Sequence, residues 1–290
     1  MDIGMRRVLH AVVPVELEFP AAMESSLREV LEGEYDAPYF GDGLTIVDVG
    51  ANVGSFSLWA ELRWPRSTIH AYEPNPSTFD MLVRNVGHLP NIRCEQVAVY
   101  TSEHATERLI SRYAGDGEAG LVDAMATTWR ALPTARMMDV PVRAPRDLPA
   151  ADIVKVDAEG SEALIVEGLR LERTSLLLVE YQNLDNLERI MRATRGRMEL
   201  IRHTSHPWDP LLKSGEYRLE LRGDRYGTMV LGRLDTPRLR RGAPPATART
   251  PSAAGERLRA ALRSLPRLIA RAARTRVMGL RRRSSVRTPD

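Results

Sequence analysis

The chain has 290 residues, of which 43% are hydrophobic, and a formal net charge of +3, so it can bury a substantial core without disulfides or metals. Its single cysteine, Cys94, excludes an intramolecular disulfide, and no Cys/His cluster has zinc-ligand spacing. No run approaches the ~18 apolar residues of a membrane-spanning helix, and acidic residues interrupt the N-terminal apolar stretch too early for a signal peptide. We therefore expect a cytoplasmic protein.

Residues 1–43 are predicted to form an entry segment, with a helix over Met23–Leu31. From residue 44 to residue 234, short apolar strands alternate with helices, which predicts an α/β fold with a mainly parallel sheet covered by helices on both faces. The strands are expected at Leu44–Val49, Thr68–Tyr72, Asn91–Tyr100, Asp152–Val156, Ser175–Glu180, Met198–His203 and Gly227–Leu234, and the helices at Ser55–Leu62, Ser77–Val86, Glu162–Leu169 and Leu184–Arg195.

The stretch Thr101–Pro149 is too long for a plain loop. We expect it to contain a hairpin and a helix around Val122–Leu132 that covers the site.

The first strand is followed by a glycine-containing loop, Asp48-Val-Gly50-Ala-Asn52-Val-Gly54. Gly50 permits a sharp turn and leaves room for a ligand against the backbone, and Gly54 lets the next helix approach the sheet. Ligands of such sheets bind beyond the carboxyl ends of the strands. Taken alone, the loop is also compatible with a dinucleotide site or an ordinary turn.

Glu73 ends the second expected strand and is followed by Pro74-Asn75-Pro76. A carboxylate there can accept hydrogen bonds from both hydroxyls of a ribose. Asp48 would repel a diphosphate, which otherwise binds at such a helix N-terminus, but it suits the ammonium and sulfonium charges of S-adenosylmethionine. The loop and Glu73 together predict a site for this methyl donor.

These segments resemble the first two signatures of class I methyltransferases, and Val154–Glu162 is similar to the Lys-x-Asp-x-Glu-Gly-x-Glu hallmark of the FkbM-family methyltransferases. The resemblance covers about Thr45–Asn183. It implies a Rossmann-like sheet of seven strands with an antiparallel last strand, and transfer of a methyl group to a hydroxyl of a sugar, polyketide or other secondary metabolite. The donor-binding residues it implies are Asp48, Gly50, Ala51, Asn52, Gly54, Glu73, Pro74, Asn75 and Ala98. Ala98, with Gln96, is expected near the adenine.

Three acids are expected at the carboxyl edge of the sheet, near the sulfur of the donor. Asp157 and Glu159 follow the fourth strand, and Glu180 ends the fifth. Methylation of an alcohol requires loss of its proton, which a nearby carboxylate can accept, and crowded acids raise one another's pKa. Asp157 is our leading candidate for the base or substrate-orienting group, with Glu159 and Glu180 shaping the acceptor pocket. Glu162 is expected to face the N-terminus of the next helix.

Two other uses of nearby residues stay open. Oxygen-rich sites suit Mg²⁺, so a divalent metal is an alternative that we do not favour. His203 and His206 are second candidates for the base because imidazole titrates near neutrality, although a polar loop explains them as well. Trp208 could line an acceptor pocket or simply pack.

The C-terminal part has a different composition. Asp235–Asp290 contains fifteen arginines against three acids, a net charge of +12 that leaves −9 on residues 1–234. After a proline-containing linker, Leu258, Leu262, Leu265, Ile269 and Ala272 form a stripe at helical spacing, interrupted by Pro266. The tail is therefore either an amphipathic helix that contacts an anionic surface or a disordered cationic segment.

We thus divide the chain into an entry segment (1–43), a methyltransferase domain (44–234) and a basic tail (235–290). The expected partner is a small hydroxylated acceptor, and the acidic body gives no sign of a nucleic-acid partner. Two alternatives remain: a nucleic-acid methyltransferase anchored by its tail, and a donor-binding module without catalysis.

Overall fold

The computed structural model describes residues 6–9, 16–31, 33–37, 39–113, 115–124, 135–204, 206–207, 225–233 and 240–241. Of the helix expected around Val122–Leu132, only residues 122–124 are described, and they form a turn. Trp208, the side chain of His206 and the apolar stripe of the basic tail lie outside the description.

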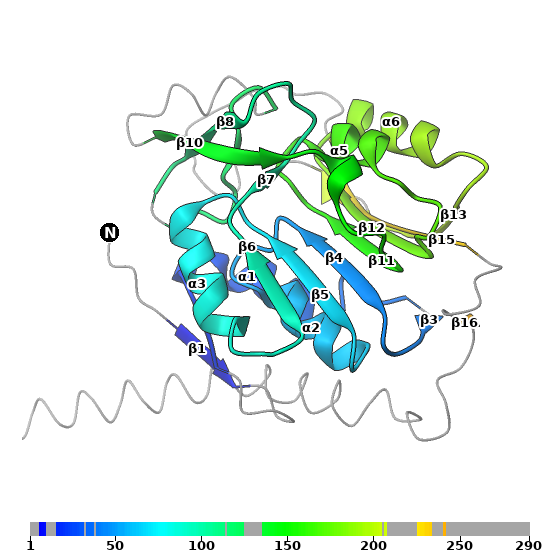
Figure 1. The fold of residues 1–290 in the computed structure, drawn as a ribbon, viewed down its shortest axis with the longest axis horizontal. Helices are drawn as coiled ribbons and strands as arrows, with labels where there is room; N and C mark the ends of the chain where they lie inside the picture. The colour runs from blue at the N-terminus through cyan, green and yellow to red at the C-terminus, as the bar shows by residue number, and fades with distance from the viewer. Residues whose placement is uncertain are drawn as a thin grey trace, which may run out of the picture.

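The core of the molecule is one sheet with the strand order β13-β15-β12-β11-β4-β5-β6 (Figure 1). Neighbours from β12 to β6 are parallel, whereas β15 runs antiparallel between β12 and β13. The Rossmann-like α/β fold with an antiparallel last strand is therefore confirmed. The strands are β4 (Thr45–Val49), β5 (Thr68–Tyr72), β6 (Ile92–Glu95), β11 (Ile153–Val156), β12 (Leu176–Tyr181), β13 (Glu199–His203) and β15 (Arg225–Gly232), with β14 (His206–Pro207) paired to β15.

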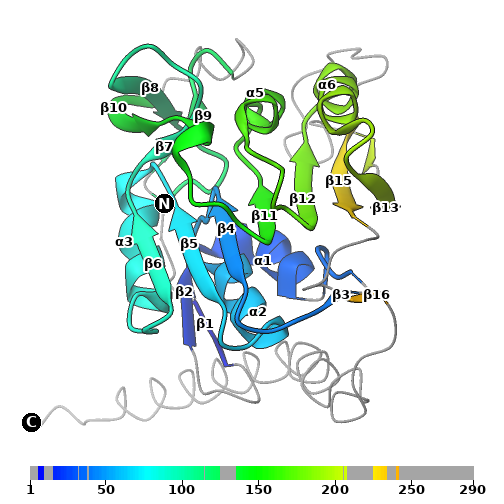
Figure 2. The same cartoon turned by 45° about the vertical axis from the view of Figure 1, so that its right-hand side comes forward.

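Helices cover both faces of this sheet because successive side chains of a strand point to opposite faces. Ile46 belongs to the hydrophobic cluster shared with helices α1, α2 and α3, and its neighbour Val47 belongs to the cluster shared with α5 and α6. Figure 2 shows the two layers on either side of the sheet. The helices are α1 (Glu24–Leu31), α2 (Ser55–Arg63), α3 (Pro76–Val86), α5 (Glu162–Gly168) and α6 (Leu184–Thr194).

The third expected strand, Asn91–Tyr100, is two strands rather than one. β6 ends at Glu95, and β7 (Ala98–Val99) leaves the main sheet to pair with β10 (Arg136–Arg143). Pairing with β5 ends at this point: the N–H of Glu73 bonds the carbonyl of Glu95, and Pro74 has no N–H to continue the ladder.

The expected hairpin within residues 101–149 is present. β8 (Thr106–Ser111) pairs antiparallel with β10, and β9 (Gly120–Leu121) adds to β8, which gives a small sheet of order β7-β10-β8-β9. A 3-10 turn, Pro145–Asp147, follows β10. The small sheet lies over the carboxyl end of the main sheet (Figure 1).

The entry segment packs on the main sheet. It contains the hairpin β1 (Arg6–Leu9) and β2 (Glu16–Phe19), the 3-10 turn Ala21–Met23 and α1, which confirms most of the expected helix. Leu17, Phe19 and Leu27 belong to the same hydrophobic cluster as Ile46. β3 (Tyr39–Phe40) pairs with β16 (Arg240–Arg241), so entry segment and linker meet, and the proposed domain boundaries stay a prediction. No described helix is long and apolar enough to cross a membrane.

Candidate active site

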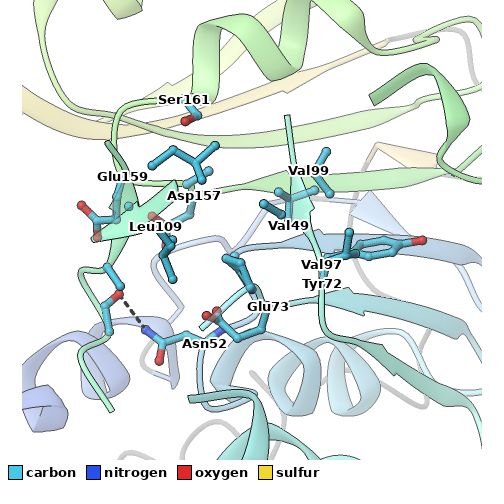
Figure 3. A pocket seen from close by; sticks show the side chains of 18 residues that line it. Val49, Asn52, Tyr72, Glu73, Val97, Val99, Leu109, Asp157, Glu159 and Ser161 are labelled. Atoms are coloured by element: carbon cyan, nitrogen blue, oxygen red, sulfur yellow. Dashed lines mark hydrogen bonds between the residues drawn. The ribbon is translucent and has the colours of Figure 1, made fainter. Parts of the chain in front are cut away.

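A pocket lies where β4, β5 and β11 end, below the small sheet (Figure 3). It encloses about 550 Å³ of empty space, part of it open to solvent. Its lining residues are Val49, Gly50, Asn52, Tyr72, Glu73, Pro74, Val97, Ala98, Val99, Leu109, Gly117, Ala119, Gly120, Leu121, Asp157, Ala158, Glu159 and Ser161.

Five of the nine residues expected to bind the donor line this pocket: Gly50, Asn52, Glu73, Pro74 and Ala98. The other four lie behind it. Asp48, Ala51 and Asn75 are buried, and Gly54 caps α2 with a φ of 95° and packs on Leu82 and Val86 of α3. Their assignment as donor-binding residues stays a prediction.

Gly50 is required for a reason that the sequence did not show. Its φ is +70°, and an added Cβ would lie 1.7 Å from the backbone oxygen of Asp157. The chain after β11 occupies the space of the missing side chain, while Gly50 still lines the pocket, so the contact of a ligand with its backbone stays a prediction. Gly50 brings the loop after β4 against the loop that carries Asp157.

Glu73 is hydrogen-bonded to the donor loop and to the start of α3. Its Oε2 accepts a hydrogen bond from the N–H of Asn52, and its Oε1 accepts one from the N–H of Asn75, both at 2.9 Å. Burial raises the pKa of Glu73 to about 7 against the lowering effect of these bonds. A carboxylate oxygen can accept more than one hydrogen bond, so Glu73 retains the capacity to bind ribose hydroxyls.

The loop between β8 and β9 covers the pocket from the side of the small sheet. The amide of Asn52 donates to the carbonyl of Gly117, and the amide of Asn75 donates to the carbonyl of Asp116, both at 3.3 Å. Figure 3 draws the first of these bonds as a dashed line. Asn52 of the donor loop and Asn75 at the start of α3 thus attach the covering loop.

Asp48 does not line the pocket. It is fully buried, accepts a hydrogen bond from Ser57 at 2.7 Å and lies 3.4 Å from the ammonium of Lys155. Burial raises its pKa, and Lys155 opposes that rise. The expectation that Asp48 faces the charges of the donor is not supported by this position, since its partners are side chains of the protein.

The three candidate catalytic acids lie near one another. Asp157 and Glu159 line the pocket, and Glu180 is in hydrogen-bonding reach of Asp157. Burial, together with the charge of Asp157, raises the pKa values of Glu159 and Glu180 well above their ordinary range. Asp157 differs from its neighbours because Lys155 lies 3.3 Å from its Oδ2.

Glu162 begins α5, as expected, and in addition it holds the preceding loop by hydrogen bonds. It is fully buried, and its carboxylate accepts N–H bonds from Ala158, Gly160 and Asn186. It therefore shapes the loop between β11 and α5, which carries Asp157 and Glu159.

His203 pairs with Tyr181 rather than with the acids. The Tyr181 hydroxyl lies 2.8 Å from Nε2 of His203, and the two rings stack with centroids 5.7 Å apart. Among the described residues, no group of three or more His, Cys, Asp or Glu side chains has a geometry that could bind a metal ion. Metal dependence stays untested.

Two functional positions were not identified from the sequence. Glu34 of the entry segment accepts a hydrogen bond from Thr228 at 2.6 Å and interacts electrostatically with Asp157, and no sequence pattern places it there. Lys155 did have a signal, since it is a charged residue within the wholly buried strand β11, and such a charge requires partners.

A family model described as the methyltransferase FkbM domain matches residues 48–218, more than half of the chain. This chain belongs to the FkbM methyltransferase family. The match includes the donor loop, the covering loop and the acidic segment after β11, so the pocket is the candidate active site of an FkbM-family methyltransferase.

Three curated proteins are similar to this methyltransferase. Methyltransferase 1 of Beauveria bassiana (strain ARSEF 2860) is 29% identical over 49% of this chain and 65% of its own length. Methyltransferase sdnD of Sordaria araneosa is 25% identical over 49% of this chain and 67% of its own length. The 31-O-demethyl-FK506 methyltransferase FkbM of Streptomyces tacrolimicus is 43% identical over 24% and 27%. The chain thus spans about two thirds of the first two relatives and a quarter of the third.

Solved methyltransferases resemble the fold weakly. Precorrin-6y C5,15-methyltransferase from Geobacter metallireducens GS-15 has a TM-score of 0.37 and 18% identity over 71% of this chain and 86% of its own. TYW2 of P. horikoshii in complex with MeSAdo has a TM-score of 0.41 and 13% identity over 79% and 69%. The fold assignment rests on the strand order rather than on these likenesses.

Proposed function

We propose that this FkbM-family methyltransferase transfers a methyl group from S-adenosylmethionine to a hydroxyl of a small molecule, a sugar or a secondary metabolite such as a polyketide or glycoside. The observation that carries the proposal is Asp157, whose carboxylate lines the pocket beside the donor loop and pairs with the ammonium of Lys155.

The chain's own residues fit the donor. Glu73 offers acceptors for the ribose hydroxyls, and Val97, Ala98 and Val99 form an apolar wall of the pocket. The side-chain oxygen of Asn52 is buried and has no hydrogen-bond partner among the described residues. When bound, S-adenosylmethionine supplies an electrophilic methyl carbon and leaves as S-adenosylhomocysteine.

Asp157 suits the proton transfer that a hydroxyl acceptor requires. As the oxygen–methyl bond forms and the sulfur–methyl bond breaks, the hydroxyl proton passes to the carboxylate of Asp157. Burial and the charge of Asp157 raise the pKa values of Glu159 and Glu180, and these two side chains shape the acceptor pocket.

The name of one relative agrees with this reaction. The Streptomyces relative is named for methylation at an oxygen of FK506. The match covers a quarter of each chain, so it supports the type of reaction and leaves the acceptor to experiment.

The test is turnover of purified full-length protein with S-adenosylmethionine and a panel of sugars, glycosides and polyketides, read as S-adenosylhomocysteine formed and as methyl ether by mass spectrometry. We expect Asp157→Asn to lower kcat by about 100-fold or more with little change in S-adenosylhomocysteine affinity. Asp139→Asn, an exposed carboxylate on β10, is the matched control.

Wild-type turnover by Asp157→Asn would remove Asp157 from the mechanism. Methylation of RNA in a salt-sensitive manner would favour the nucleic-acid alternative, and donor binding without any methyl transfer would favour the binding module. Loss of turnover with excess chelator would establish a metal requirement.

A further inference from the structure

Lys155 is the buried cation between the donor loop and the candidate base. Its side chain is 4% exposed. Its ammonium donates to the carbonyls of Gly50 at 2.7 Å and Val49 at 3.3 Å, and it lies 3.4 Å from Oδ1 of Asp48 and 3.3 Å from Oδ2 of Asp157. Four oxygens from two strand ends therefore meet at one ammonium.

Strand pairing explains why this position is fixed. Lys155 of β11 stands directly beside Asp48 of β4 in the parallel register, and the two chains continue side by side into the loops that line the pocket. Burial of a lysine is costly unless it is paired and hydrogen-bonded. Although burial lowers the pKa of Lys155, the charges of Asp157 and Asp48 raise it above its ordinary value, so this lysine is a permanent cation and not a base.

The groups around the carboxylate of Asp157 show why its ion pair with Lys155 matters. The titratable groups that interact with Asp157 are Lys155 on β11, Asp48 on β4, Glu159 in its own loop, Glu162 at the start of α5, Glu180 on β12, and Glu34 and Tyr35 after α1. Among these groups Lys155 is the one that carries a positive charge. Without it, an ionised Asp157 would face only acids.

We infer that Lys155 is a positioning residue: one buried ammonium fixes the backbone of the donor loop at Val49 and Gly50 and orients the carboxylate of Asp157. This inference deepens the proposed function and rests on it for the role of Asp157. The contact with the donor loop does not depend on which acceptor is methylated.

The first test measures binding of S-adenosylhomocysteine by calorimetry to full-length protein. Lys155→Met alone leaves Asp48 buried without its cation and is expected to destabilise the fold. The double variant Lys155→Met/Asp48→Asn removes both charges, so we expect it to unfold cooperatively near the wild-type midpoint. Its affinity for S-adenosylhomocysteine should nevertheless fall at least tenfold, because Val49 and Gly50 lose their donor.

Arg189→Met is the control for loss of a cation, since Arg189 pairs with Glu167 away from the pocket, and its affinity should match the wild type. Wild-type affinity in the folded double variant would overturn the inference. Failure of the double variant to fold would assign Lys155 to the stability of the fold and would also overturn it.

The second test uses an acceptor found by the screen described above. In the folded double variant we expect kcat to be reduced by a larger factor than the KM of the acceptor is raised, because the carboxylate of Asp157 is no longer oriented. An unchanged kcat would contradict the role toward Asp157. If no hydroxylated acceptor is found, the proposed function fails while the calorimetric result still decides the contact with the donor loop.

Discussion

Glu73 illustrates how a single buried carboxylate can make donor binding depend on pH. Both of its oxygens accept backbone N–H bonds, so the side chain is oriented before any ligand arrives. Burial raises its pKa to about 7, which places its ionisation within the working pH range of most enzymes.

The affinity for S-adenosylhomocysteine should therefore fall below about pH 7. Ribose hydroxyls donate to an ionised carboxylate, whereas a protonated Glu73 has lost acceptor capacity. Above the midpoint the affinity should be constant, and below it the limiting loss is about tenfold per pH unit. Calorimetry between pH 5.5 and 8.5 measures this profile. Glu73→Gln should bind weakly at every pH, and a flat wild-type profile would contradict the prediction.

A comparison of Gly50 with Gly43 distinguishes the cost of backbone strain from the cost of steric overlap. Both have a positive φ, +70° and +62°, but an added Cβ meets the oxygen of Asp157 at Gly50 and nothing within 4 Å at Gly43. A left-handed alanine costs about 1–2 kcal/mol, which both variants share.

Gly50→Ala should additionally displace the loop after β11 and reduce S-adenosylhomocysteine affinity by about 100-fold or more. Gly43→Ala should lose only the strain energy and bind normally. Thermal unfolding and calorimetry on the two variants make the comparison. Equal affinities in both would show that the close approach of the two loops is not needed for the donor site.

At the scale of elements, the small sheet is the part of the fold that encloses the pocket. Its β8–β9 loop is attached to the donor loop by the amide of Asn52 and to α3 by Asn75 and Ser77. The amide of Asn52 donates to the loop while its backbone N–H donates to Glu73, so one residue links the cover to the ribose carboxylate.

Asn52→Gly should loosen this cover. Glycine tolerates the φ of +52° at this position but has no amide to donate to Gly117. We expect faster amide hydrogen exchange over residues 115–119 and faster dissociation of S-adenosylhomocysteine. Ser77→Ala, which removes the bond to the N–H of Gly115, should accelerate exchange at 115 alone. Unchanged exchange in Asn52→Gly would show that the amide does not attach the loop.

At the scale of the whole molecule, the pairing of the linker with the entry segment shows where a truncation of the basic tail should begin. β16 pairs with β3, so Arg240 and Arg241 belong to the folded body. A truncation intended to remove only the basic tail should therefore begin at residue 242.

A chain that ends at Arg241 should keep donor binding and catalysis. Its free energy of unfolding should stay within about 0.5 kcal/mol of the full chain, as for changes remote from packed contacts. Chemical denaturation and turnover with the same acceptor provide the measurements. Loss of cooperative unfolding would show that the tail is structural, and loss of turnover alone would show that it contributes to the acceptor site.

The positions of the strands followed from the sequence because apolar runs separated by glycine and proline are local signals. Thr68–Tyr72 was predicted with the observed ends, and most other strand ends lie within one or two residues of the expected ones. The exception is Asn91–Tyr100, which is two strands. Its pairing with β5 (Thr68–Tyr72) stops where Pro74 has no N–H to donate, and residues 91–100 by themselves carry no signal of this.

The sequence also determined the donor loop, Glu73, and Asp157 with Glu159 as pocket residues, since strand ends in a parallel sheet converge on one edge. Only the tertiary structure decided what those residues face. Gly50 makes room for the chain after β11, and the carboxylate of Asp48 lies beside the ammonium of Lys155. Glu34 reaches the same acids from the entry segment. Such contacts join segments more than a hundred residues apart, and burial and pairing in three dimensions, rather than local pattern, set their charges.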